Sequence, residues 1–298
     1  MVPRRRRRRR RTCEPGADRA RTQVWSIDTY ELVATLKGHS GSVLSLTLAA
    51  AQGLLFSSGG DAIIQVWNAD TLAHLYSIYS TFDVGDVFCV AYSAALQTLW
   101  CGAQNTSIQW YDLRKKDRAQ PPSLQSHPAK RLHSFFDSKG PGGRSTPRPS
   151  SRDQWEDGSV TASAAMLEVA PTDIVQYAHY GYVYCMLVVP AAHIAKGEGE
   201  VLLSGGGDGD VKLWNIDVAT GAISELCTLS GGDAGVLSMA INDTMLYCGM
   251  TDGEICIWDL DALQLVRTVK AHCDDVLTLS IKGNYIFSGS ASGYVRVC

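Results

Sequence analysis

The chain has 298 residues, of which 45% are hydrophobic and 19% charged, and its formal net charge is −3. The hydrophobic fraction suffices for a buried core, while no uninterrupted apolar run approaches the ~18–20 residues that a membrane-spanning helix needs. The nine cysteines include no Cys-x-x-Cys pair, which argues against a zinc site or a disulfide framework and favours a reducing, cytoplasmic location.

Eight consecutive arginines, Arg4–Arg11, lie within residues 1–18, which we expect to form a disordered, arginine-rich leader. Without these arginines, 19 basic residues would stand against 30 acidic ones. Such a tail can bind nucleic acid, acidic lipid or an import receptor; the alternative is a leader without consequence. We do not expect nucleic-acid or membrane partners, but the run leaves the nucleus open as an alternative location.

Residues 19–298 carry a repeat of short alternating strands, each ending at one recurrent position that is usually aromatic. Successive positions are 42, 44, 103, 44 and 40 residues apart and are occupied by Trp25, Trp67, Tyr111, Trp214, Trp258 and Cys298. A period near 40–45 residues is typical of an all-β β-propeller, in which each repeat forms one four-stranded blade. Because a single blade cannot bury its own faces, the repeat predicts a ring of stacked sheets.

The repeat predicts about five recognisable blades, which open at His39, Asp83, His179, Gly232 and His272. Before the first blade we expect an inner strand over 22–25 and an outer strand over 30–36. The outer strand could close a five-bladed ring against the last repeat, but residues 22–25 would then compete with 295–298 for one place. We therefore expect an incomplete part of a larger, seven-bladed ring.

Recurrent polar positions within the repeat resemble the WD-repeat family. Asp61, Asp208 and Asp252 stand six residues before the closing Trp, in a turn where a short polar side chain can bond its own backbone. Three histidines each stand four residues before a valine and are interpreted as structural. The resemblance implies a hydrogen-bonded His, Ser, Asp and Trp network inside the blades, formed by His39, Ser45, Asp61, Trp67, His179, Asp208, Trp214, Asp252, Trp258 and His272.

In two repeats the histidine position is occupied by another residue, Asp83 in the second blade and Gly232 in the fourth. These two blades depart from the family pattern, so the network is open to question there.

The step of 103 residues reflects a long insertion after Tyr111. Residues 113–163 hold six of the ten prolines and show no strand alternation, so we expect a disordered, basic loop within the second blade. Residues 164–169 are interpreted as the delayed outer strand of that blade. Within the loop, Phe135 and Phe136 are a candidate docking element, the alternative being a Phe pair folded back onto the blade rim.

No motif of the sequence points to catalysis, to a cofactor or to a metal ion. There is no His-Glu-x-x-His, no Gly-x-Ser-x-Gly and no Walker loop. Residues 205–210, Gly-Gly-Gly-Asp-Gly-Asp, look like a phosphate or calcium loop, but they occupy the turn of the repeat and open no helix. We therefore expect a non-catalytic chain that binds no cofactor.

Two segments carry a narrower resemblance: Phe-Phe-Asp-Ser-Lys-Gly-Pro-Gly-Gly at 135–143 and Gln-Tyr-Ala-His-Tyr-Gly-Tyr-Val-Tyr-Cys at 176–185. They are similar to the amino-terminal propeller of the Dug-type subunit of the fungal glutathione degradosome. Members of that family join a WD-repeat propeller to a separate metallopeptidase-like domain and act with a glutamine-amidotransferase-like partner. The resemblance implies that this chain is the scaffold portion of a subunit that degrades glutathione, a γ-glutamyl peptide.

Two functions remain open. The first is a non-catalytic protein–protein interaction scaffold within such a peptidase complex. The alternative is a free-standing nuclear or ubiquitin-pathway adaptor that holds its partners with the basic leader and insertion. A peptidase reading frame beyond Cys298 in the gene would favour the first.

Overall fold

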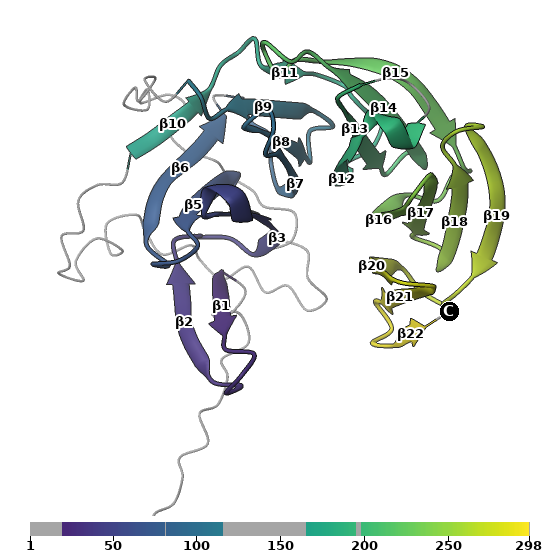
Figure 1. Cartoon of the computed structure of the whole chain (residues 1–298), viewed down its shortest axis with the longest axis horizontal. Helices are drawn as coiled ribbons and strands as arrows, with labels where there is room; N and C mark the ends of the chain where they lie inside the picture. The colour runs from purple at the N-terminus through teal and green to yellow at the C-terminus, as the bar shows by residue number, and fades with distance from the viewer. Residues whose placement is uncertain (1–19, 81, 116–164, 195–197, 298) are drawn as a thin grey trace, which may run out of the picture.

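The computed structural model describes residues 20–80, 82–115, 165–194 and 198–297. In this part of the chain the strands form six sheets, which stand side by side around a common axis (Figure 1). The first strand of each successive blade lies innermost, so the architecture is that of a β-propeller, as predicted. The described residues also contain two short 3-10 helices, η1 (Ala50–Gln52) and η3 (Ala191–Ile194).

We number the blades I to V in chain order. A two-stranded sheet precedes them and consists of β1 (Arg21–Trp25) and β2 (Leu32–Lys37). Blade I contains β3 (Val43–Ala49), β4 (Leu54–Gly59), β5 (Ile63–Asn68), β6 (His74–Ser80) and, on its outer edge, β10 (Ala165–Val169). Blade II contains β7 (Val87–Ser93), β8 (Thr98–Ala103), β9 (Ile108–Asp112) and β11 (Ile174–Val175).

In the remaining three blades the strands lie side by side in the order in which they occur along the chain. Blade III contains β12 (Val183–Pro190), β13 (Glu200–Gly206), β14 (Asp210–Ile216) and β15 (Ile223–Ser230). Blade IV contains β16 (Val236–Asn242), β17 (Met245–Met250), β18 (Glu254–Asp259) and β19 (Gln264–Lys270). Blade V contains β20 (Val276–Lys282), β21 (Tyr285–Ser290) and β22 (Val295–Val297).

The core lies between the blades and not within any one of them. Side chains alternate along each inner strand, so every second residue packs against the preceding blade. Val90 of β7 packs on blade I, Met186 of β12 on blade II and Met239 of β16 on blade III. Each interface is therefore a layer of mostly aliphatic and aromatic side chains shared by two neighbouring sheets.

The interpretation of residues 164–169 as the outer strand of blade II is wrong. These residues form β10, which pairs with β6 in parallel and makes blade I five-stranded. The outer strand of blade II is the two-residue β11, which pairs with β9. Leu167 and Val169 explain why β10 joins blade I, because both are buried against the core between blades I and II.

The sheet at the start of the described chain pairs with no blade. Within the described residues β2 pairs with β1 alone, and β22 pairs with β21 alone, so strand 30–36 does not close the ring onto blade V. The strand also begins later than predicted, at Leu32, because Tyr30 sits in a turn with a φ of 56°. A seven-bladed total stays a prediction.

The leader predicted for 1–18 and most of the insertion lie outside the described residues, as do Phe135 and Phe136. The insertion starts later than predicted, however. Leu113 is 3% exposed and belongs to the core between blades I and II, and Arg114 pairs with Asp112 at the end of β9. No helix among the described residues is long and apolar enough to cross a membrane.

If β10 packs as a fifth strand, replacing Leu167 by Ala should lower the free energy of unfolding by about 2–4 kcal/mol, because a buried leucine is lost. Met166→Ala is the matched control: Met166 lies in the same strand, points to the other face and is only partly buried. Chemical denaturation of both variants measures the difference. Equal, small losses would mean that β10 does not pack on blade I.

Candidate functional site

The predicted blade network is present in blade I, with one change of membership. His39 Nδ1 lies 3.0 Å from Asp61 Oδ1, and His39 Nε2 lies 2.8 Å from Ser57 Oγ. Trp67 Nε1 donates to the same hydroxyl at 2.9 Å. The hydroxyl that joins His and Trp is therefore that of Ser57 on β4, and the assignment of Ser45 to the network is wrong.

Blade III repeats the arrangement with slightly shorter distances. His179 Nδ1 lies 2.9 Å from Asp208 Oδ1, His179 Nε2 lies 2.7 Å from Ser204 Oγ, and Trp214 Nε1 donates to Ser204 at 2.8 Å. Because the carboxylate can only accept, Nδ1 carries the proton, and Nε2 of a neutral ring accepts the serine hydroxyl. The His179 side chain is 0% exposed. All donors are satisfied without a ligand.

The electrostatics agree with a neutral imidazole beside an ionised carboxylate. Burial lowers the pKa of His179 despite the neighbouring Asp208 carboxylate. Burial alone would raise the pKa of Asp208, but the interaction with His179 and hydrogen bonds from backbone amides, including that of Tyr180, outweigh it and hold the pKa below its usual range. The pair is therefore a structural element that titrates only on acidification.

Blades IV and V form only fragments of the network. In blade IV Gly232 stands at the histidine position and Cys248 at the serine position, so Asp252 and Trp258 are not joined by it. Asp252 instead accepts the Glu254 amide at 3.0 Å, closing its own turn. In blade V, His272 Nε2 lies 2.8 Å from Ser288 Oγ. The turn aspartates are thus structural, and residues 205–210 form the end of β13, the turn 207–209 and the first residue of β14.

The position of Ser45 has a different role in the other blades, where it connects neighbouring sheets. Cys89 and Cys185 each donate a thiol hydrogen bond to the first carbonyl of the next blade, and Ser238 Oγ donates to Val276 O at 3.1 Å. Burial raises the pKa of the Cys89 and Cys185 thiols well above their usual value, so both stay protonated donors. These cysteines link neighbouring blades by hydrogen bonds, and a buried, protonated thiol is a poor nucleophile.

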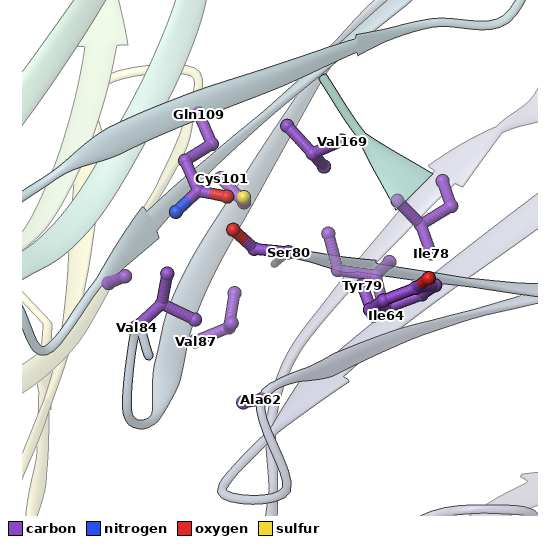
Figure 2. A pocket seen from close by; sticks show the side chains of 11 residues that line it. Ala62, Ile64, Ile78, Tyr79, Ser80, Val84, Val87, Cys101, Gln109 and Val169 are labelled. Carbon is purple, nitrogen blue, oxygen red and sulfur yellow. The ribbon is translucent and has the colours of Figure 1, made fainter. Parts of the chain in front are cut away.

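The interior offers no room for a small-molecule ligand at the seam of blades I and II. Figure 2 shows the pocket there, lined by side chains of both blades and by Val169 of β10. Its free volume is about 10 Å³, the space of a single water molecule. Among the described residues, no group of three or more His, Cys, Asp or Glu side chains is arranged to hold a metal ion.

A larger cavity, of about 360 Å³, opens at the rim of blade II. Its wall contains the carboxylate of Asp83, the amide of Asn105 and two aromatic rings, Phe82 and Tyr177. Phe82 is 38% and Tyr177 80% exposed. Sequence reasoning missed this site, although one observation pointed to it: blade II replaces both members of the His–Asp pair, by Asp83 and Asn105.

Comparison with known proteins agrees with this fold. The family model for the WD domain, G-beta repeat, matches residues 30–68, 173–215, 223–259 and 263–298. The crystal structure of the computationally designed Ika8 protein superposes with a TM-score of 0.56 at 21% identity, over 95% of this chain and 66% of that one. The chain belongs to the WD-repeat family.

Individual relatives match most of this chain, which covers only part of their own length. The chain is 30% identical to "Probable di- and tripeptidase DUG2" of Saccharomyces cerevisiae over 93% of its own length and 35% of that protein. It is 27% identical to the guanine nucleotide-binding protein subunit beta of Arabidopsis thaliana, over 94% of this chain and 62% of the relative. The chain thus spans about a third of the peptidase and less than two thirds of the β-subunit.

The network predicts a stability difference between two aspartates at the same position of the repeat. Asp208→Ala removes the acceptor of His179, Tyr180 and Asp210, so it should lower the free energy of unfolding by about 1–3 kcal/mol. Asp252→Ala removes a turn hydrogen bond alone and should lower it by less than about 1 kcal/mol. Urea denaturation compares the two. A larger loss at Asp252 would contradict the structural role of the network.

Acidification should destabilise the protein in the range where free histidine titrates. Because the folded pKa of His179 is lowered, the unfolded chain takes up the proton first, and stability falls as the pH drops below about 6.5. His74, whose pKa burial also lowers, acts with the same sign. His179→Gln should therefore flatten, without abolishing, the decrease in melting temperature between about pH 7 and 5. An unchanged slope would show that His179 does not titrate on unfolding.

Proposed function

We propose that this chain is a non-catalytic protein-interaction scaffold, the propeller portion of a subunit that takes part in the degradation of glutathione. The observation that carries the proposal is the 30% identity to the yeast di- and tripeptidase, which extends over 93% of this chain. Glutathione is itself a tripeptide, so the class of substrate named for that relative includes it.

The internal organisation of the described residues supports a scaffold. The conspicuous polar side chains of blades I and III satisfy one another inside the blade, and their histidines are buried away from solvent. By contrast, aromatic side chains are exposed to solvent at Tyr177 and Tyr180, and Tyr177 lines the cavity at the rim of blade II. Aromatic residues are enriched where proteins contact one another. The chemistry of such a subunit would then reside outside the propeller.

A glutamine-amidotransferase-like subunit is the partner that we propose, following the resemblance of residues 135–143 and 176–185 to the Dug-type family. The cytoplasm is the proposed location, because its reducing conditions suit the buried thiols. Burial raises the pKa of Cys101 to about 12, so this thiol stays protonated at neutral pH.

Replacing the matching segment of yeast DUG2 by this chain tests the proposal. The chimera should support growth of yeast cells that lack their own DUG2 with glutathione as the only sulfur source, and should retain its partner in co-precipitation. The matched control carries the equivalent segment of the Arabidopsis β-subunit, a WD-repeat relative of 27% identity, and should fail in both assays. Equal failure of both chimeras, at equal protein levels, would refute a role in glutathione degradation.

A further inference from the structure

The rim cavity of blade II exists because two residues of the repeat are exchanged there. In blades I and III an imidazole stands at the first position and donates to an aspartate at the second, as in the pair His179 and Asp208. Blade II has Asp83 at the first position and Asn105 at the second. In blade II the carboxylate therefore belongs to the first position, Asp83, instead of the turn position, and no imidazole stands at the first position.

The exchange leaves a carboxylate whose bonds within the blade are weak. Asp83 Oδ1 accepts the Gly85 amide at 3.4 Å, and Asn105 Nδ2 donates to the main-chain oxygen of Asp83 at 3.3 Å. Asn105 Oδ1 is taken up by the amide and hydroxyl of Ser107. Among the described residues, no lysine or arginine forms an ion pair with Asp83. Among the described residues that line the cavity, Asp83 is the one charged residue.

Two aromatic rings complete the wall of the cavity beside the carboxylate. Tyr177 follows the short β11 and has a φ of 56°, a conformation that a bulky residue seldom adopts without a reason. Tyr177 and Gln176 line the cavity together with Asp83. A carboxylate and an exposed aromatic ring in one cavity suit a guanidinium group, which can form an ion pair with the first and a cation–π contact with the second.

We propose that this cavity binds an arginine side chain presented by a partner protein. The volume of about 360 Å³ accommodates a whole arginine side chain. Asp83 supplies the counter-charge, the exposed Tyr177 ring the stacking face, and the Gln176 carboxamide an additional acceptor. The proposal deepens the scaffold role given above and rests on it, because it assigns one contact point and the chemistry of the partner that fills it.

Titration of the ¹⁵N-labelled chain with N-acetyl-arginine amide tests the site directly. We expect saturable shifts of the Asn105 and Gln176 side-chain amides, with a dissociation constant on the order of millimolar for a single side chain. N-acetyl-citrulline amide has nearly the same shape without the charge and should bind at least about fivefold more weakly. Equal shifts with both probes, or none with arginine up to tens of millimolar, would overturn the proposal.

Variants assign the binding to the named groups. Asp83→Asn keeps the turn geometry and should weaken arginine binding at least about fivefold. Tyr177→Asn removes the ring while suiting the positive φ and should weaken it about threefold or more. Asp233→Asn is the matched control, since it removes an exposed carboxylate at the corresponding rim of blade IV, and should leave binding unchanged.

Melting curves of the variants show that each is folded. Loss of binding in Asp233→Asn as well as Asp83→Asn would reveal general charge attraction and refute the site. The probe is a free, capped amino acid, so its binding does not depend on the glutathione-degrading complex. A failure here leaves that function standing, and a failure of the yeast chimera leaves the arginine site standing.

Discussion

Burial between neighbouring blades is the constraint on which the rest of the structure depends. The same position of the second strand is occupied by Phe56, Trp100 and Leu203, each 0% exposed, because each lies between two sheets. The corresponding Phe287 of blade V is 37% exposed, since no following blade covers it among the described residues. A residue in this fold is thus buried by its neighbour's sheet, and the sequence repeats because each blade must offer the same two faces.

The polar networks add hydrogen bonds within single blades to this packing between blades. In blades I and III, the Asp closes a turn and accepts from the His, while a Ser links the His to the Trp, so side chains connect two strands to the loop before the inner strand. Blades IV and II lack this arrangement and depend more on packing and on the bonds that cross between blades. The family model leaves residues 69–172 unmatched, the region that holds blade II and the insertion.

Most of the fold could be predicted because the residues that end the strands recur with a regular period. No such period shows which sheet edge a strand pairs with. Ser45 and Ser57 both occupy recurrent small polar positions, and spacing alone could not show that Ser57 faces the imidazole while the Ser45 position faces the next blade. The sequence pattern of residues 164–169 predicts an outer strand, and the structure contains one there. Which blade this strand joins depends on where Leu167 can be buried. Phe135 and Phe136 remain a prediction.

The candidate site follows from the same reasoning applied to an exception. A residue that departs from the repeat pattern no longer forms the hydrogen bonds of the blade network. Its contribution to stability and binding then depends on its surroundings at the surface. Asp83 stands where a buried imidazole stands in blades I and III, yet it is exposed, and it lines one cavity with Tyr177, which follows the two-residue outer strand. Desolvating a carboxylate is unfavourable unless a cation accompanies it. A partner that covers this rim must therefore bring its own positive charge, and the exposed Tyr177 ring in the same cavity favours a guanidinium over an ammonium.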